Sequence, residues 1–198
     1  DTSGEFVREG VQSSSGSTLS RSYAIYPYNR SATITSDGVI SSELAVEQSY
    51  VENSVSRGAN MMAAVTSSKK DRHLSFKNLC SYVCVELYGK GVLLKNIKLI
   101  SNGGEKIAGA LTLSPSDGMF VATAAQSAVD MITLNLGGGV LLSESAAEAT
   151  KFYFATLPTT LATGFTITAV DNSGESFTIN VDSKVELERS ALYKVAAT

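Results

Sequence analysis

The chain has 198 residues, 43% of them hydrophobic, which is enough to bury a sizeable core in one large domain or two small ones. Its formal charge of −3 comes from 16 Lys and Arg against 19 Asp and Glu spread without blocks, so we expect no nucleic-acid or anionic-lipid partner. No window approaches the roughly 20 apolar residues of a membrane-spanning helix, and no secretory leader opens the chain, so we expect any targeting segment to have been removed already.

The first third of the chain carries the weakest pattern. Residues 1–20 are rich in Ser and Gly and predict a short strand around Phe6 followed by a flexible loop. Between residues 29 and 60 only Val39–Ile40 and Leu44–Val46 suggest ordered structure.

The stretch "YAIYPY", from Tyr23 to Tyr28, alternates as a half-exposed strand does, and its proline favours a sheet edge. The three tyrosines, Tyr23, Tyr26 and Tyr28, could also form an aromatic surface that stacks on sugars. Packing in the core or at an edge is the favoured interpretation, because large aromatic side chains are usually buried.

A polar segment, "SSKKDRH" at residues 67–73, precedes the most apolar block of the sequence, and we place a domain boundary there. The predicted domains are residues 1–72 and 73–198. The basic side chains of this segment are interrupted by Asp71, which favours a solvated loop.

The two cysteines, Cys80 and Cys84, lie four residues apart in a predicted strand over Leu79–Tyr88. At about 3.3 Å per residue they share a face but lie about 13 Å apart, too far for a disulfide between them. We therefore expect free thiols, which leave the cellular compartment undecided.

The central segment "SNGGEKIAGALTLS", Ser101 to Ser114, raises the question of a phosphate-binding loop. A Walker-type loop needs Lys followed by Ser or Thr and then a helix, whereas Lys106 is followed by Ile107 and by strand-like alternation. The preceding "LLKNIKLI" alternates in the same way, so the two runs predict an antiparallel hairpin with a glycine turn.

Strand signals continue to the end of the chain. A second hairpin joins "GFTITAV" to "SFTINV" through "DNSGE", which reads as an Asx-type turn and not as a calcium loop.

Gly137–Gly139 predict a bulge or a turn, and "SESAAEAT", Ser143–Thr150, predicts about two helical turns at most. The remaining predicted strands are Met61–Thr66, Met119–Thr123, Asp130–Leu136, Phe152–Ala155 and Lys184–Leu187. The sequence therefore predicts an all-β fold.

No catalytic, cofactor-binding or metal-binding constellation emerges. The chain has one histidine, His73, in a charged loop, and no G-x-S-x-G elbow. Two cysteines and a remote histidine do not supply a zinc site. We therefore expect a protein for binding or assembly that is not an enzyme and needs no cofactor.

Seven segments occur in a characteristic order: "YAIYPYN", "AVEQSYVENS" with Gln48, "GANMMAAV", "LSFKNLCSYVCVELYG", "VLLKNIKLISNGGEKIAGALTL", "FYFATLPTTLATGFTITAVDNSGESFTINV" and "ELERSALYKV". Together they resemble the fimbrillin-like surface proteins of Gram-negative anaerobic bacteria. The resemblance extends from about Phe6 to Val195 and depends on the combination, since each piece alone is weak.

The resemblance implies two transthyretin-like antiparallel β-sandwich domains and display on the cell surface or outer membrane after export as a lipoprotein. It implies a role as a fimbrial subunit, anchor, tip or related adhesin, with other fimbrial subunits as partners. Members of the family usually carry a lipidated cysteine and opening strands ahead of the position of "SGEF", so we expect the first sandwich to lack its opening strands and any membrane attachment to depend on an upstream lipid anchor. Proteolytic trimming is one of the explanations that stay open for this start.

In related pilins, removal of an N-terminal strand opens a groove that a strand of the next subunit fills. The candidate donor here is the tail "VELERSALYKVAAT", with Val185, Leu187, Leu192 and Val195 as possible anchors. The alternative is a monomeric surface lipoprotein that binds a glycan or a host protein through an exposed site around Tyr23, Tyr26 and Tyr28.

Overall fold

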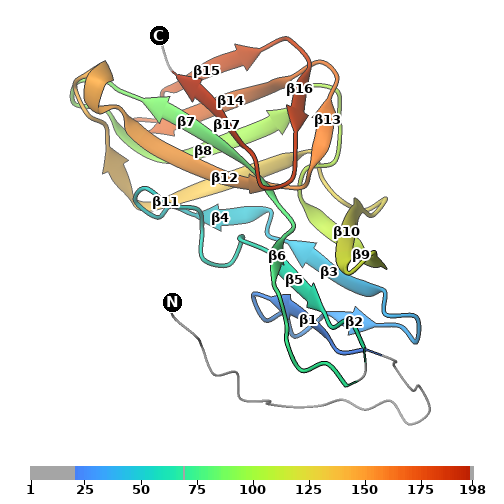
Figure 1. The fold of residues 1–198 in the computed structure, drawn as a ribbon. Helices are drawn as coiled ribbons and strands as arrows, with labels where there is room; N and C mark the ends of the chain where they lie inside the picture. The colour runs from blue at the N-terminus through green and yellow to red at the C-terminus, as the bar shows by residue number, and fades with distance from the viewer. Residues whose placement is uncertain (1–20, 69, 197–198) are drawn as a thin grey trace.

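The computed structural model describes residues 21–68 and 70–196, and within them the fold is all-β, as predicted (Figure 1). The strands form five sheets, most of whose pairings are antiparallel. One helical segment occurs among the described residues, a single 3-10 turn, η1 (Ala146–Glu148). No helix in this part of the chain has the length and apolarity needed to cross a membrane.

Two sheets lie at the end of the molecule that holds the first strands. One has the order β1 (Tyr23–Tyr26), β5 (Met62–Val65), β6 (Lys77–Asn78). The other has the order β10 (Met119–Ala124), β9 (Gly109–Ser116), β3 (Ile40–Leu44), β2 (Thr33–Ile34).

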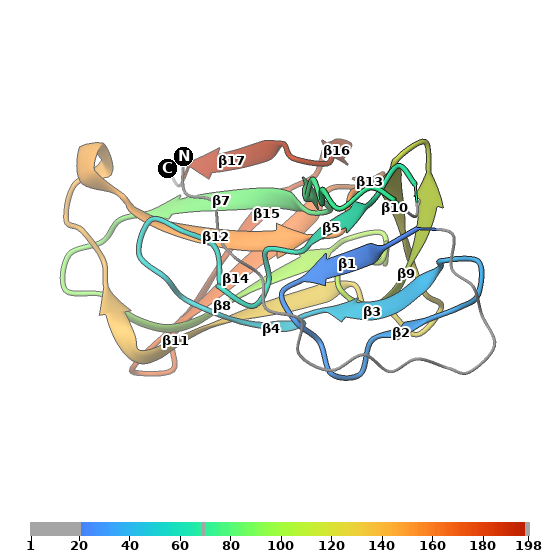
Figure 2. The ribbon, with the colours of Figure 1, turned by 60° about the horizontal axis from the view of Figure 1, so that its bottom comes forward.

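The remaining sheets form the larger part of the fold. The five-stranded sheet has the order β15 (Ser176–Val181), β14 (Phe165–Asp171), β8 (Leu93–Ser101), β11 (Met131–Leu141), β4 (Glu47–Ser49). A three-stranded sheet, β12 (Thr150–Thr156), β7 (Ser81–Leu87), β17 (Leu192–Ala196), lies over it, and β13 (Thr159–Leu161) pairs with β16 (Val185–Leu187) (Figure 2).

The core of this sandwich follows from period-two alternation. Ile97 and Leu99 of β8 are buried while Lys98 between them is only half-buried. On β12, Phe152 and Phe154 are fully buried on the face toward the core. Because successive side chains of a strand point to opposite faces, each such run fills one layer of the core.

The C-terminal hairpin is confirmed. Phe165, Ile167 and Ala169 pair with Val181, Ile179 and Phe177 in antiparallel register. The turn closes as an Asx turn, since Asp171 Oδ1 accepts hydrogen bonds from the backbone N–H groups of Ser173 and Glu175 at 2.8 and 3.0 Å. The bulge at Gly137–Gly139 is also confirmed, because the register of β11 against β8 shifts between Asn135 and Val140.

The hairpin predicted between residues 93–100 and 107–113 is wrong. Strand β8 pairs with β11 and β14, whereas β9 pairs with β3 and β10 in a different sheet. The connection is held away from a hairpin turn by Glu105, whose carboxylate accepts hydrogen bonds from the Ser101 hydroxyl and, at 2.8 Å, from the Ala162 N–H. Alternation identifies both strands correctly but does not identify their partners.

The sequence predicts two helical turns at most over Ser143–Thr150, and the structure has one turn there, η1. The Ser145 side chain caps it by accepting a hydrogen bond from the Ala147 N–H at 3.2 Å. The division into residues 1–72 and 73–198 stays a prediction, and so does the transthyretin-like assignment. Among the described strands, three pairings cross that boundary: β3 with β9, β4 with β11 and β5 with β6.

Both cysteines are free and buried, Cys80 just before β7 and Cys84 within it. Burial raises the pKa of the Cys80 thiol to about 11 and also raises the pKa of Cys84. The thiolate is the nucleophilic form, so we expect both thiols to react slowly in the folded chain.

We therefore predict that neither cysteine reacts with a thiol reagent such as Ellman's reagent at pH 8 while the chain is folded. At that pH, with a pKa near 11, roughly one Cys80 thiol in a thousand is ionised. Addition of urea should release two reactive thiols per chain, and reaction of the folded chain at the rate of a free cysteine would contradict the assignment.

The side chain of Gln48, on β4, is 1% exposed and joins two sheets. Its Nε2 donates to the carbonyl oxygen of Ala155 at 2.7 Å and to that of Ala45 at 3.1 Å. The Ala155 N–H donates back to Gln48 Oε1 at 3.0 Å. The amide thus pairs with β12 as a strand backbone would, and it ties the edge of the five-stranded sheet to the sheet above.

Replacing Gln48 with Leu should lower the free energy of unfolding by about 2–4 kcal/mol, because the buried N–H and C=O of Ala155 lose their partner. The measurement is urea denaturation of the purified chain. The control is Glu47→Ala, an exposed neighbour on the same strand, which should change stability by less than about 0.5 kcal/mol. Equal effects of the two substitutions would contradict this role.

Candidate functional site

The candidate donor tail is paired within the chain itself. Strand β16 pairs antiparallel with β13, and its two apolar side chains, Val185 and Leu187, are buried. Strand β17 pairs in parallel with β7 at the edge of its sheet; there Val195 is buried, whereas Leu192 is 44% exposed. Leu192 and Val195 lie three residues apart and so occupy opposite faces of the strand.

A shallow groove lies between the edges of the first two sheets. Among the described strands, β1 is at the edge of one sheet and β2 is at the edge of the other. A cavity of about 170 Å³ between them is lined mainly by apolar side chains, among them Tyr23, Ile25, Ile34 and Ile40. Ile34 is 45% exposed at this groove, which leaves an apolar surface next to two strand edges.

The three tyrosines do not form one surface. Tyr23 is half-buried and packs edge-to-face on Phe120, with ring centroids 6.1 Å apart. Tyr26 and Tyr28 are 43% and 83% exposed. Tyr28 lines a cavity of about 280 Å³ together with Asn29, Arg30 and Glu43, so the exposed aromatic contact reduces to Tyr28 and its polar neighbours.

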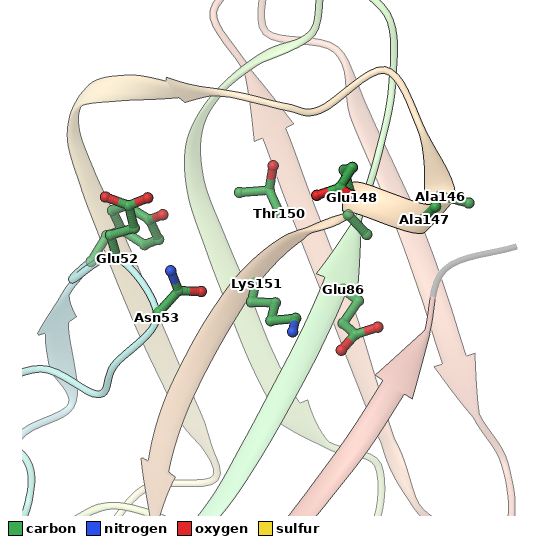
Figure 3. Close-up of a pocket in the computed structure, with 10 residues that line it drawn as sticks. Glu52, Asn53, Glu86, Ala146, Ala147, Glu148, Thr150 and Lys151 are labelled. Atoms are coloured by element: carbon green, nitrogen blue, oxygen red, sulfur yellow. The ribbon is translucent and has the colours of Figure 1, made fainter.

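A more polar pocket of about 390 Å³ lies at the other end of the fold (Figure 3). Four segments build it: the loop after β4, strand β7, the η1 turn and the start of β12. Its side chains include Tyr50, Glu52, Asn53, Glu86, Glu148, Thr150 and Lys151. The sequence analysis missed this pocket, because no local motif marks residues that only the fold brings together.

The electrostatics of the pocket are acidic. Glu86 and Lys151 are cross-strand neighbours on β7 and β12, and Glu52 and Glu148 approach from the two loops. Burial, with a contribution from the charge of Glu52, raises the pKa of the Tyr50 hydroxyl. Among the described residues no group of three His, Cys, Asp or Glu side chains is placed to hold a metal ion.

His73 lies where a solvated loop residue is expected. Its side chain is 99% exposed, with Nδ1 3.4 Å from Asp71 Oδ1. No nucleophile lies beside it among the contacts of the described residues, and its surroundings are those of a surface turn.

Among the solved structures with a similar fold are two that are described as proposed cell adhesion proteins. The protein from Bacteroides ovatus ATCC 8483 has a TM-score of 0.51 and 14% identity, over 88% of this chain and 61% of its own. The protein from Bacteroides uniformis ATCC 8492 has a TM-score of 0.52 and 16% identity, over 89% of this chain and 66% of its own. The chain thus spans a little under two thirds of the length of each, and at these identities the likeness concerns the fold alone.

No curated protein is significantly similar to the sequence. The sequence profile of the fimbrillin-like family, however, matches residues 16–198, which is nearly the whole chain and agrees with the resemblance found in the motifs. The protein therefore belongs to the fimbrillin-like family.

Proposed function

We propose that this protein is a structural subunit of a cell-surface fimbria and that it joins other fimbrial subunits by β-strand exchange. The observation that carries the proposal is the fimbrillin-like match over residues 16–198. A structural role also suits a chain whose two thiols are buried. Attachment to the outer membrane through an upstream lipid anchor is part of the same proposal.

The groove between β1 and β2 is the proposed acceptor. Strand exchange needs an unpaired edge for backbone hydrogen bonds and apolar pockets for alternate side chains of the incoming strand. Both features occur together in the described part of the chain, because β1 and β2 are edge strands there and Ile34 of β2 is an exposed apolar side chain that lines the groove.

The tail is the proposed donor, and β17 is its most easily released part. Among the described strands it has one neighbour, β7, and its one buried side chain, Val195, contributes about 1.5–3 kcal/mol of burial free energy. The half-buried Tyr193 adds an edge-to-face contact with Phe165, with ring centroids 5.8 Å apart. Release of β16 costs more, since both Val185 and Leu187 leave the core. In an acceptor groove Leu192 would gain burial that it lacks in the single chain.

Substitution of Ile34 with Asp should block assembly while leaving the chain folded, because a buried carboxylate in the acceptor groove is costly whereas an exposed one is not. The measurement is an unboiled denaturing gel of surface material sheared from the cells. The wild type should give a ladder of multimers, and the variant should give about tenfold less multimer. This corresponds to a loss of about 1.4 kcal/mol or more in the association free energy per contact.

The matched control is Val121→Asp. Val121 is an exposed aliphatic side chain on β10, at the other edge of the sheet that contains β2, so this variant should keep the ladder. Sequencing the N-terminus of each band identifies the mature start of the chain. A wild type that runs only as a monomer retaining a lipidated upstream segment would refute the polymerising subunit.

A second candidate function is adhesion to a host protein or glycan as a monomeric surface lipoprotein, favoured by the exposure of Tyr28 beside Asn29, Arg30 and Glu43. An exposed aromatic ring with planar polar neighbours can stack on a ligand and hydrogen-bond to it.

For this function we predict that Tyr28→Ala reduces the adhesion of producing cells to immobilised glycans and host matrix proteins about tenfold, equivalent to about 1.4 kcal/mol, with the multimer ladder unchanged. The control is Tyr88→Ala, an exposed tyrosine outside this cavity. Equal adhesion by the two variants would remove Tyr28 as a contact.

A further inference from the structure

The segment that follows β8 contains an Asn-Gly pair, Asn102–Gly103, the one such pair in the sequence. Asparagine followed by glycine is the dipeptide most prone to deamidation, because glycine has no Cβ to hinder attack of its backbone nitrogen on the asparagine side chain. Asn102 is exposed, so water reaches it. The sequence therefore supplies the reacting groups, and the conformation of the segment decides whether they meet.

Deamidation at this pair runs in two steps. The backbone nitrogen of Gly103 gives up its proton and forms a bond to Cγ of Asn102; the bond from Cγ to Nδ2 breaks, and the amide leaves with that proton as ammonia. The product is a five-membered succinimide, which water opens at either carbonyl carbon to give aspartate or isoaspartate at position 102. Nothing is oxidised or reduced, and solvent water is the one co-reactant.

Both polar atoms of the Asn102 side chain are bound to the segment that leads into β14. Nδ2 donates to the carbonyl oxygen of Thr163 at 3.0 Å, and Oδ1 accepts from the hydroxyl of Thr166 at 2.7 Å. The Asn102 backbone N–H donates to the carbonyl oxygen of Gly164 at 3.1 Å. Ring closure expels Nδ2 and moves Cγ toward the nitrogen of Gly103, so it works against both side-chain bonds.

The backbone of Gly103 lies against the carboxylate of Glu105. A Cβ atom at position 103 would lie 2.5 Å from Glu105 Oε1, so a side chain there would displace the carboxylate from its bonds. Those bonds come from the Ser101 hydroxyl and from the Ala162 N–H, which donates to Oε1 at 2.8 Å. Donors to the carboxylate, the Ser101 hydroxyl first and the Gly103 N–H among the others, lower the pKa of Glu105.

An ionised carboxylate at this place suppresses the nucleophile. The nitrogen of Gly103 must lose its proton before it attacks, and the negative charge that then develops faces the negative charge of Glu105. Like charges at close range disfavour the ionised form of both groups. The closed segment therefore hinders the reaction twice, at the leaving amide and at the attacking nitrogen.

We propose that Asn102 is a deamidation site that residues 101–105 hold closed, so that the reaction proceeds only in molecules in which this segment opens. Opening of a short surface segment costs less free energy than unfolding of the whole chain. It ends both restraints at once, because the side-chain bonds and the contact with Glu105 depend on the same conformation. The inference goes beyond the proposed fimbrial function and does not depend on it.

The product changes the connection that carries the chain from β8 to β9, which lie in different sheets. Aspartate or isoaspartate at position 102 lacks the Nδ2 donor to Thr163 and adds a negative charge close in sequence to Glu105. Isoaspartate also adds a methylene group to the main chain. Because the ammonia is lost, the change is one-way and marks the chains in which this connection has opened.

The test follows deamidation of the purified full chain at pH 8, folded and in guanidinium chloride. Peptide mass spectrometry gives the fraction converted at position 102, and a protein isoaspartate methyltransferase counts the isoaspartate. The folded wild type should react at least about tenfold more slowly than the unfolded chain, because only the open fraction of molecules reacts. Equal rates would remove the closure, and no conversion in the unfolded chain would remove the site.

Two variants open the segment from different sides. Thr166→Val removes the donor to Asn102 Oδ1 and should speed the reaction of the folded chain at least about threefold, the value of one hydrogen bond. Glu105→Ala removes the carboxylate from the nucleophile and should speed it at least about tenfold. The matched controls, Thr168→Val on the same face of β14 and Lys106→Ala in the same segment, change none of these bonds and should react as the wild type does.

Asn172, followed by serine in the turn after β14, is an internal reference in every sample. Local opening of residues 101–105 speeds conversion at Asn102 alone, whereas unfolding of a variant speeds conversion at both asparagines. Wild-type rates in both variants, equal acceleration by the controls, or a rise that Asn172 shares in both variants would each overturn the inference.

Discussion

A buried amide, that of Gln48, closes one side of the main sandwich. A sandwich of two sheets is held by its apolar core, but its edges leave unpaired backbone groups that need partners. At the edge formed by β4 and β12 those partners are the side-chain oxygen and nitrogen of Gln48, bonded to both backbone groups of Ala155. Because β4 and β12 lie about 100 residues apart in the sequence, this contact also joins two distant parts of the chain.

The opposite side of the sandwich has no such closure. Its edges are β15 and β17, and a cavity of about 530 Å³ between them is lined by apolar side chains that include Tyr88, Val92 and Phe177. This difference between the two sides supports the proposal that the C-terminal strand is the donor. Release of β17 would disrupt its pairing with β7, the burial of Val195 and the packing of Tyr193 on Phe165, while the Gln48 contact and the aromatic core of β12 would stay in place.

The sequence predicts elements better than partners, for a physical reason. Alternation reports that one face of a run is buried, and this found Ile97 and Leu99 as well as the strand that contains Leu111. It carries no information about which strand lies alongside, so β8 and β9 were joined in a hairpin that the fold does not contain. The C-terminal hairpin was predicted correctly because its turn chemistry, centred on Asp171, is local. The candidate sites depend on features that alternation does not report. The strand predicted over Tyr23–Tyr28 ends at Tyr26, so Tyr28 is exposed in the loop after β1, and the polar pocket joins four segments and leaves no local signal.

The proposed exchange of β17 would draw on apolar surface that the single chain leaves in water. An exchanged strand makes many backbone hydrogen bonds and buries apolar side chains, so such a contact forms slowly and dissociates slowly. In the single chain Leu192 of β17 is 44% exposed, and Ile34 at the groove between β1 and β2 is 45% exposed. Assembly through this groove would bury both side chains, which is where the free energy of the proposed contact would come from.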